Sequence, residues 1–528
     1  MQGVPKPVVL AILDGFGIAR ATRGNAIRAA RAPHLTTIEQ YFPFTALQAS
    51  GVAVGLPWGE VGNSEVGHMT IGAGRVLYQH LVRILNALED GSFHKNSAFL
   101  KVIAHAKAKG SAIHLLGLVS TGSVHSSLEH LYALLDLVAE PDSPKAYLHV
   151  ITDGRDAPLE EAGALVAELQ AKIAARYPTA AIASLIGRFY AMDRDQQWDR
   201  VQKTYELLTS ARGIPFTDPA DYLRQSYRRG TSDEFIEPAC LGRDGAPVGR
   251  IKAGDGLIMF NFREDSMREM ASAFAERDFT AFSRESVPNL AIATMTEYKA
   301  GLPGVLVAFP PLAVDWPLAR VLAEAGKTQL HVAESEKYAH VTYFFNGGRD
   351  APFPNEERIA IPSLGMPHFD DHPEMKAPEI TETVTENLDR YDFIIANYAN
   401  ADMVGHTGKF QAAVNAIEAL DVAIGRLSEE ILKRSGVLLV TADHGNAEQK
   451  IHPQSGEPVT EHTGNPVPFY LIGASYRRRN TRSVEEIEAE KRSVRGILTD
   501  VAPTILELMH LKKPEPMTGK SLLSILTP

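Results

Sequence analysis

The segment Val61-Gly62-Asn63-Ser64-Glu65-Val66-Gly67-His68-Met69-Thr70 places a single serine in a glycine-rich setting, with a histidine four residues later. Glycines let the backbone come close to a ligand and let a side chain project from a tight turn. The segment holds little that would pack as an ordinary core helix, so it predicts a loop. A lone serine in such a loop is usually a turn residue, and Ser64 becomes a candidate for chemistry only together with other motifs.

Three further segments each follow an apolar run and contain Asp, or Asp and His, followed by Gly. They are residues 13–17 (Leu-Asp-Gly-Phe-Gly), 400–408 (Asn-Ala-Asp-Met-Val-Gly-His-Thr-Gly) and 441–446 (Thr-Ala-Asp-His-Gly-Asn). The apolar runs at 7–13, 393–398 and 437–441 are typical of buried parallel strands. Ligands of open α/β sheets bind outside the carboxyl ends of the strands, so we expect these loops and the serine loop to meet there.

Size and composition indicate an ordinary soluble protein of two domains. The chain has 528 residues, 45% hydrophobic and 22% charged, and a single cysteine, Cys240. One cysteine excludes a disulfide framework and a cysteine-based zinc site. The net charge of −11 argues against nonspecific nucleic-acid binding, although converging arginines could still bind a small anion. No signal peptide or membrane-length apolar stretch is recognised, which favours a cytoplasmic protein.

A second series of strands lies in the middle of the chain. Strands are predicted at 111–119, 145–152, 180–186 and 256–260, with helices at 76–90, 127–139 and 159–177. The strands run into loops that carry Arg155, Arg188, Arg194 and Arg263. Most arginines are solvated surface residues, but four at successive strand ends could hold a phosphate and a carboxylate through bidentate contacts.

The two series predict a discontinuous domain. Residues 300–318 are rich in Pro and Gly and indicate a connection between domains, after which strands reappear at 330–332, 393–398 and 437–441. We therefore expect an α/β protein of two domains. Residues 1–77 and 311–528 would form one domain, into which residues 78–310 are inserted as a second α/β domain.

The polar residues of the first domain suit a pair of metal ions. The candidates are Asp14, Ser64, Asp402, His406, Asp443, His444 and His462. Carboxylate and imidazole ligands favour Mn²⁺, Zn²⁺ or similar ions over Ca²⁺. Seven ligands exceed one tetrahedral site but suit two adjacent metals, which can stabilise the entering and leaving oxygens of phosphoryl transfer and activate a serine. Taken singly, His406 or His444 could equally be a buried structural histidine.

These motifs resemble those of the cofactor-independent (2,3-bisphosphoglycerate-independent) phosphoglycerate mutases and occur in the same order along the chain. The resemblance extends to the segments 123–126, 153–156, 187–194 and 336–342. The resemblance covers nearly the whole chain. It implies an alkaline-phosphatase-like metal domain with an inserted substrate-binding domain. It also implies an isomerase, EC 5.4.2.12, that interconverts 3-phosphoglycerate and 2-phosphoglycerate in glycolysis and gluconeogenesis through a phosphoserine intermediate.

The resemblance also assigns roles to residues. Ser64 would be the nucleophile, Asp156 the acid and base for the glycerate hydroxyls, and Lys337 would balance charge beside the phosphoserine. One metal would be held by Asp402, His406 and His462, and the other by Asp14, Ser64, Asp443 and His444. The substrate would be bound by His125, Arg155, Asp156, Arg188, Arg194, Arg263 and Lys337. The cofactors would be two divalent ions, first of all Mn²⁺, with Mg²⁺, Zn²⁺ or Co²⁺ as alternatives, and no 2,3-bisphosphoglycerate. The expected protein is a cytoplasmic monomer that binds neither nucleic acid nor membranes.

One residue departs from the family pattern. The family motif Asn-Phe-Arg-x-Asp-Arg reads here Asn261-Phe262-Arg263-Glu264-Asp265-Ser266. If a helix follows the strand, residues 263 and 266 lie one turn apart on the same face, and Arg263 acts without a second arginine. Arg268 would lie too far around that helix to replace it. Under this geometry, Ser266→Arg is expected to lower KM for 3-phosphoglycerate.

Four other functions compete with this interpretation. A phosphopentomutase or a simple phosphatase of the same superfamily would fit the metal loops, but the arginine loops favour phosphoglycerate. A sulfatase is disfavoured because Cys240 lies in none of the metal loops. A non-catalytic phosphate-binding protein would tolerate the loss of Ser64 or a metal aspartate, yet all of these residues are present.

Overall fold

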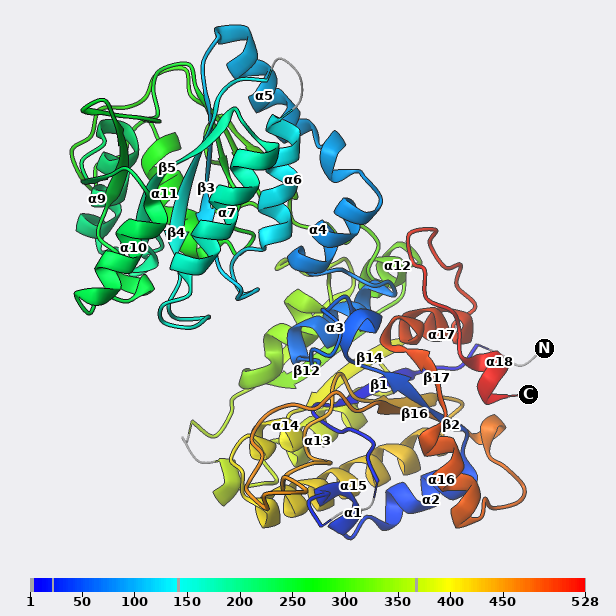
Figure 1. Cartoon of the computed structure of the whole chain (residues 1–528). Helices are drawn as coiled ribbons and strands as arrows, with labels where there is room; N and C mark the ends of the chain where they lie inside the picture. The colour runs from blue at the N-terminus through cyan, green and yellow to red at the C-terminus, as the bar shows by residue number, and fades with distance from the viewer. Residues whose placement is uncertain (1–3, 21–22, 140–142, 366–368, 528) are drawn as a thin grey trace. The chain divides into compact units, whose positions relative to one another are not determined.

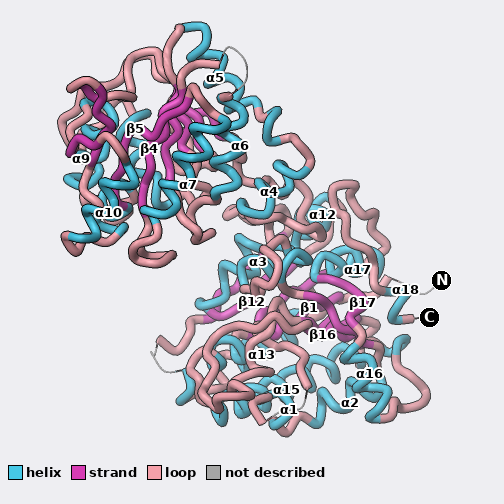
Figure 2. Tube along the Cα trace, viewed as in Figure 1, coloured by secondary structure: helices cyan, strands magenta, loops and turns pink. Residues whose placement is uncertain are grey.

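The computed structural model describes residues 4–20, 23–139, 143–365 and 369–527. The chain divides into two compact units. Unit 1 comprises Met1–Gln79 and Leu312–Pro528, and unit 2 comprises His80–Pro311. Each unit is built on its own sheet with helices against it, as the colouring by secondary structure in Figure 2 shows. The expected α/β class is confirmed.

Unit 1 contains an eight-stranded sheet (Figure 1). Its strands, in spatial order, are β13 (Glu356–Ile361), β12 (Gln329–Glu334), β14 (Phe393–Tyr398), β1 (Val8–Leu13), β15 (Val437–Thr441), β16 (Val467–Ile472), β2 (Phe44–Gln48) and β17 (Val494–Ile497). β1 pairs in parallel with β14 and β15, so the loops after all three strands leave the sheet at the same edge. The sequence Val-Val-Leu-Ala-Ile-Leu of β1 is apolar throughout because both of its faces are buried.

Helices cover both faces of this sheet. On one side lie α3 (Ser64–Ala73), α12 (Leu318–Glu324) and α17 (Val501–Leu508), and on the other α2 (Pro33–Tyr41), α13 (Ala377–Asn387) and α15 (Phe410–Leu432) (Figure 1). Among the described residues, no helix combines the length and apolar character needed to cross a membrane.

The loop predicted around Ser64 is wrong, because Ser64 begins helix α3. The side chain of Asn63 caps the helix by accepting a hydrogen bond from the backbone N–H of Val66. The glycine that suggested a turn has a packing role: a Cβ at Gly67 would lie 2.6 Å from the carbonyl oxygen of Asp443. Glycine therefore lets this buried helix approach the loop after β15.

Unit 2 contains a nine-stranded sheet. Along its main path lie β11 (Val305–Val307), β10 (Ala291–Thr294), β9 (Gly256–Met259), β3 (Ile113–Leu118), β4 (Ala146–Thr152), β5 (Ala180–Gly187), β7 (Ala239–Arg243) and β6 (Ile214–Phe216), and β8 (Ala246–Pro247) pairs with β7. The strands from β11 to β5 are parallel. The four strands predicted here are confirmed within a few residues at their ends.

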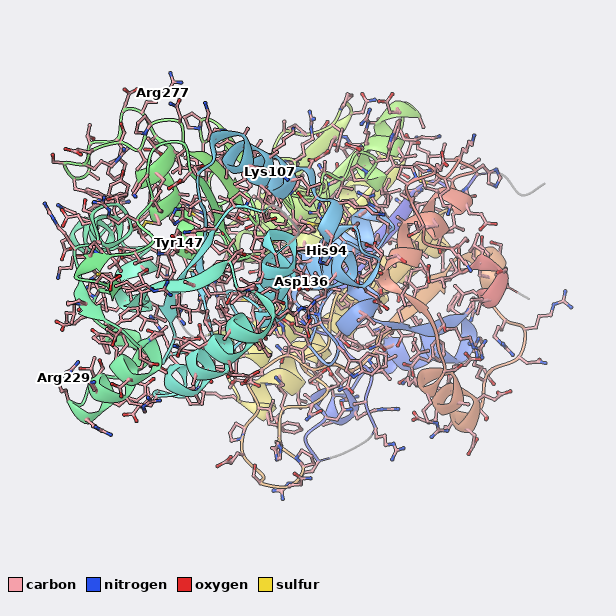
Figure 3. The ribbon with its side chains drawn as sticks, turned by 45° about the horizontal axis from the view of Figure 1, so that its top comes forward. His94, Lys107, Asp136, Tyr147, Arg229 and Arg277 are labelled. Atoms are coloured by element: carbon pink, nitrogen blue, oxygen red, sulfur yellow. The ribbon has the colours of Figure 1, made fainter. Side chains whose placement is uncertain are left out.

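The helices of unit 2 form two apolar layers against the sheet. One layer includes α4 (His80–Glu89), α5 (Ser97–Lys109), α6 (Leu128–Val138), α7 (Ala162–Arg176) and α10 (Pro219–Arg228), and the other includes α9 (Trp198–Ser210) and α11 (Arg268–Ala275). Charged side chains such as Arg229 and Arg277 are exposed and project outward (Figure 3). The helices predicted at 76–90, 127–139 and 159–177 correspond to α4, α6 and α7.

Candidate active site

Ser64 lies at the amino end of α3, where its side chain is surrounded by charged groups. Its Oγ is 3.1 Å from Asp14 Oδ1, 3.0 Å from His444 Nε2 and 2.7 Å from Lys337 Nζ, and the residue is only 7% exposed. The first turn of a helix favours negative charge, because its N–H groups lack partners within the helix. A nucleophilic oxygen, or a phosphate bonded to it, would be stabilised at this position.

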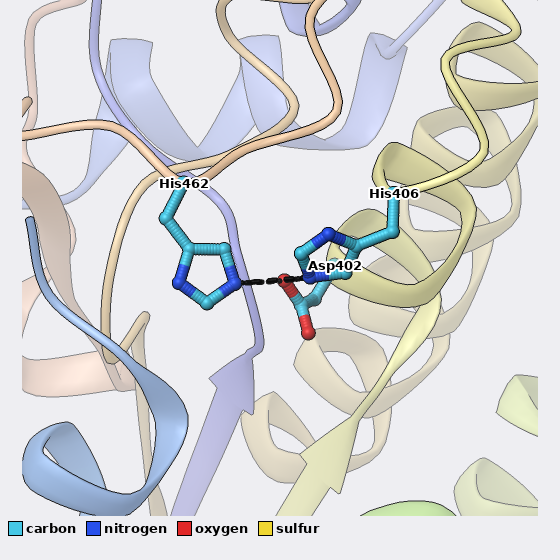
Figure 4. A group of neighbouring side chains, drawn as sticks. All are labelled: Asp402, His406 and His462. Carbon is cyan, nitrogen blue, oxygen red and sulfur yellow. Dashed lines mark hydrogen bonds and ion pairs between the residues drawn. The ribbon is translucent and has the colours of Figure 1, made fainter. Parts of the chain in front are cut away.

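The first metal-ligand group consists of Asp402, His406 and His462 (Figure 4). Asp402 lies in α14 (Asn400–Gly405), which follows β14. The Nε2 atoms of the two histidines are each 3.1 Å from Asp402 Oδ1 and 3.0 Å from one another. Ligands about 2.0–2.2 Å from a tetrahedral metal lie roughly 3.3 Å apart, so the spacing suits one ion.

The histidine rings of this group are oriented by backbone carbonyls. Nδ1 of His406 donates to the carbonyl oxygen of Thr460 at 2.7 Å, and Nδ1 of His462 donates to that of Gly62 at 2.9 Å. A carbonyl only accepts hydrogen bonds, so in the neutral rings both Nε2 atoms carry lone pairs. When both rings are neutral, these lone pairs and the Asp402 carboxylate converge without a proton between them, and a cation would stabilise this arrangement. The hydrogen bond with Asp402 raises the pKa of His406, so a proton competes with the metal for this place.

The second group consists of Asp14, Asp443 and His444, all fully buried. His444 Nε2 is 3.4 Å from Asp14 Oδ1 and 3.6 Å from Asp443 Oδ2. His68 Nδ1 lies 3.1 Å from Asp443 Oδ2 but donates its hydrogen to the carbonyl oxygen of Ser64 at 2.9 Å. Asp443 Oδ2 is therefore a buried anionic oxygen without a hydrogen bond, and a metal would satisfy it.

Lys337 links the two groups. Its Nζ lies 2.8 Å from Asp14 Oδ1 and 2.7 Å from Asp402 Oδ2, and the residue is buried. Burial alone would lower the pKa of Lys337, but the charges of Asp14 and Asp402 outweigh it and raise this pKa above its ordinary value. Burial raises the pKa of Asp14, yet Lys337 and His444 bring it well below the ordinary range. Both groups are therefore charged.

Several residues that support these groups were not predicted from the sequence. They are His68, Asn397, Asn446, Glu448 and Lys450, all buried. Asn397 Nδ2 donates to Asp14 Oδ2 at 2.8 Å, and Asn446 Nδ2 donates to Asp402 Oδ1 at 2.8 Å. His68 and Asn446 lie in the quoted segments 61–70 and 441–446, whereas the sequence offered little signal for Asn397, Glu448 and Lys450.

In unit 2, Arg188 is the centre of a buried polar cluster. Its Nη1 is 2.6 Å from Asp153 Oδ1 and 2.5 Å from Asp156 Oδ2, and its Nη2 is 2.9 Å from His125 Nε2. Arg188 begins the short helix α8 (Arg188–Ala191) directly after β5, and Asp153 follows β4. The parallel pairing of β4 with β5 brings these two loops together.

The other predicted arginines of unit 2 lie near this cluster. Asp265 pairs with Arg194 Nη1 at 2.9 Å and with Arg263 Nε at 3.0 Å. A cavity in unit 2 is lined by residues that include His125, Arg155, Arg188, Arg194, Ser266 and the unpredicted Arg200. Arg263 is not among the residues lining that cavity.

The helical geometry expected for Arg263 and Ser266 is wrong. Residues Asp265–Met267 form a 3₁₀ turn and α11 begins only at Arg268, so Arg263 precedes the helix. Ser266 is buried, and its Oγ lies 3.1 Å from His125 Nδ1. Arg268 Nε donates to the carbonyl oxygen of Tyr298, which agrees with the expectation that Arg268 does not replace a substrate arginine.

Comparisons with known proteins identify close relatives. A family model described as "BPG-independent PGAM N-terminus" matches residues 84–300. A protein of Moorella thermoacetica named 2,3-bisphosphoglycerate-independent phosphoglycerate mutase is 46% identical over 98% of this chain and 99% of its own length. One of the same name from Clostridium novyi is 46% identical over the same shares of both chains. The crystal structure of Leishmania mexicana phosphoglycerate mutase at low cobalt concentration is 30% identical, covers 98% of this chain and 97% of its own, and superposes with a TM-score of 0.58.

Proposed function

The chain belongs to the family of 2,3-bisphosphoglycerate-independent phosphoglycerate mutases, and on this basis we propose which of its residues perform the reaction. The protein is an isomerase, EC 5.4.2.12, that interconverts 3-phosphoglycerate and 2-phosphoglycerate in glycolysis. Unit 1 is proposed as the metal-binding, phosphoryl-transferring domain and unit 2 as the substrate-binding domain. We further propose that the protein is a cytoplasmic monomer.

The surroundings of Ser64 carry the proposal. A serine hydroxyl is a weak nucleophile unless a neighbouring group lowers its pKa or removes its proton. Here Ser64 Oγ lies 2.7 Å from the Lys337 ammonium group and 3.0 Å from His444 Nε2, a ligand atom of one of the two candidate metal groups. The helix N-terminus adds a further positive field.

The donor sets fit two divalent cations. Two imidazole Nε2 atoms converge on Asp402 Oδ1, and Asp443 Oδ2 is buried without a hydrogen bond. We assign one ion to Asp402, His406 and His462, and the other to Asp14, Ser64, Asp443 and His444. When bound, such ions lower the pKa of the serine hydroxyl and neutralise charge on the transferring phosphoryl group. Mn²⁺ is the proposed ion, since oxygen and imidazole ligands suit it.

The residues of the chain then account for both halves of the reaction. Ser64 Oγ forms a bond to phosphorus while the bond between phosphorus and the 3-oxygen of glycerate breaks. The serine proton is released to water, and the Asp156 carboxylate takes up a proton from water and gives it to the freed 3-oxygen. In the second half Asp156 takes the proton of the 2-hydroxyl while the 2-oxygen attacks the phosphoserine. Asp156 then releases this proton to water, and Ser64 regains a proton from water. Lys337 stabilises the negative charge at Ser64 throughout.

The proposed contribution of unit 2 is to hold the glycerate through its arginines and neighbouring polar groups. We assign this task to His125, Arg155, Asp156, Arg188, Arg194 and Arg263, and to Lys337 of unit 1. Guanidinium groups bind carboxylate and phosphate through paired hydrogen bonds, which fixes the orientation of the ligand as well as its position. Arg188 is held at one end by Asp153, so it offers a fixed direction for such contacts.

The experiment that tests the proposal is a mutase assay with 3-phosphoglycerate and no 2,3-bisphosphoglycerate, before and after chelation. We expect activity to disappear with the metal and to return with Mn²⁺ ahead of Mg²⁺. The metal content of each sample, measured by mass spectrometry of the elements, serves as the control. Full activity in a sample without metal would refute the two-metal site, and activity that requires 2,3-bisphosphoglycerate would refute the reaction scheme. Light scattering tests the proposed monomer.

A further inference from the structure

His125 occupies a fixed place between three polar groups of unit 2. The residue is 3% exposed. Its Nε2 lies 2.9 Å from Arg188 Nη2 and 3.3 Å from Asp156 Oδ2, and its Nδ1 lies 3.1 Å from Ser266 Oγ. Its carbonyl oxygen accepts a hydrogen bond from the backbone N–H of Phe262 at 2.8 Å, which ties the loop after β9 to the loop after β3.

The hydrogen-bonding rules of these groups determine where the imidazole proton lies. A guanidinium only donates hydrogen bonds, so His125 Nε2 must accept from Arg188 and carries no proton. In a neutral ring the proton is then on Nδ1, which donates to Ser266 Oγ. The hydroxyl hydrogen of Ser266 is directed elsewhere, because Ser266 Oγ donates to the carbonyl oxygen of Arg263 at 3.2 Å. Every donor in this chain of contacts thus meets an acceptor.

The charges around the ring favour this neutral state. The groups that face His125 are Arg188 and Arg263 on the positive side and Asp156 and Asp265 on the negative side. Burial, followed by the two arginines, lowers the pKa of His125 to about 4, against the weaker opposing effect of the two aspartates. Above that pH, the ring is uncharged.

We propose that Ser266 is a positioning residue that fixes His125 as its Nδ1–H tautomer, so that the bare Nε2 holds the guanidinium of Arg188 for the substrate. This inference rests on the proposed substrate-binding role of Arg188. Without the Ser266 hydroxyl, Nδ1–H would be buried and unsatisfied, whereas the other tautomer would donate from Nε2 to Asp156. An Nε2–H would also point at the N–H of Arg188, so the guanidinium would lose its fixed direction.

The test compares Ser266→Ala with Ser266→Thr, which keeps a hydroxyl, and with Ser126→Ala. Ser126 is the matched control, because it is also buried and follows His125, but its Oγ donates to the carbonyl oxygen of Leu118. The tautomer is read without substrate from long-range ¹H–¹⁵N correlation spectra of protein labelled at its 18 histidines, with His125→Gln to assign the signals. Mutase kinetics give KM and kcat for each variant.

We expect Nδ1–H in the wild type, in Ser266→Thr and in Ser126→Ala, and Nε2–H in Ser266→Ala. In Ser266→Ala, kcat/KM should fall about fivefold to tenfold, as for one buried neutral hydrogen bond, mainly through KM. The proposal is overturned if wild-type His125 is charged at pH 7.5 or carries Nε2–H, or if Ser266→Ala keeps the wild-type tautomer. It is also overturned if the tautomer changes while KM does not. Absence of mutase activity in the wild type would refute the proposed function instead, because the tautomer is measured independently of activity.

Discussion

Replacing Glu448 by Gln tests whether one buried carboxylate holds the metal-ligand loops together. Glu448 is 1% exposed and accepts four hydrogen bonds. Its Oε2 accepts from the backbone N–H of Gly17 at 3.1 Å and of Asn446 at 2.9 Å, and its Oε1 accepts from Asn465 Nδ2 at 2.9 Å and from the Thr463 hydroxyl. These donors belong to the loops that carry Asp14, Asp443 with His444, and His462.

The expected size of the effect follows from the number of hydrogen bonds that a glutamine side chain can accept. Its amide nitrogen must face one pair of donors, so up to two hydrogen bonds are lost whichever way the amide is turned. Hydrogen bonds to a charged acceptor are worth about 1.5–3 kcal/mol each, so the loops lose about 3–6 kcal/mol if both are lost. The weakened support should lower the affinity for Mn²⁺ about 10–100-fold, as for other residues that orient metal ligands.

The assay is calorimetric titration of chelator-treated protein with Mn²⁺, together with urea unfolding of the metal-free protein. Glu457→Gln is the control, because Glu457 is exposed on a neighbouring part of the same segment. If Glu448→Gln does not fold, Asn465→Ala removes one of the four donors and should show a smaller loss of affinity. An unchanged Mn²⁺ affinity in folded Glu448→Gln would refute the idea that Glu448 positions the ligands.

Three further outcomes are expected. Ser64→Ala should fold and bind substrate but lose mutase activity by more than about a thousandfold, and mass spectrometry of trapped wild-type enzyme should find phosphate on Ser64 and on no histidine. Ser266→Arg should raise KM, contrary to the expectation from sequence, because residue 266 is buried against His125. Arg268→Ala should lower kcat/KM less than Arg263→Ala does, because Arg268 donates a hydrogen bond to the carbonyl oxygen of Tyr298. Burial raises the pKa of Glu269 from 4.5 to about 7, despite a hydrogen bond from the backbone of Gln196. The free energy of unfolding of the wild type should therefore fall as the pH rises toward and through 7. Urea unfolding should show Glu269→Gln to be more stable than the wild type by about 2–3 kcal/mol at pH 8 and by little at pH 5.

The sequence was most informative where strands are buried on both faces. Continuous apolar runs such as Val8–Leu13 and Val437–Thr441 have no polar face, and a polar residue at the end of such a run can only lie at the sheet edge. The antiparallel strand β16 and the short edge strand β17 were not predicted. β17 consists of Val-Arg-Gly-Ile, which contains both a charge and a glycine, and it owes its pairing to its neighbour β2.

The two wrong predictions about the site, at Ser64 and at Ser266, both arose because contacts with distant parts of the chain determine the local structure. Glycines near Ser64 were interpreted as turn formers, whereas Gly67 is needed because a helix passes close to the Asp443 loop. The expected pairing of residues 263 and 266 assumed a regular helix, but a 3₁₀ turn intervenes and directs Ser266 toward His125. Neither close approach has a local sequence signal, because the partner in each case lies more than 100 residues away.

The arginines of unit 2 that we propose as substrate ligands are paired with aspartates, so a protein of net charge −11 can still present cations to a small anion. Arg188 is paired with Asp153 and Asp156, and Asp265 pairs with both Arg194 and Arg263. Under the proposed substrate-binding role, an arriving phosphate or carboxylate replaces an aspartate as the partner of an arginine, and the buried Arg188 does not have to be desolvated anew. Each exchange of an aspartate for a ligand anion adds little binding free energy. An anion that contacts only one arginine therefore binds it no more strongly than the aspartate does. Under this proposal, selection among anions depends on how the spacing of the charges in the ligand matches the spacing of the guanidinium groups.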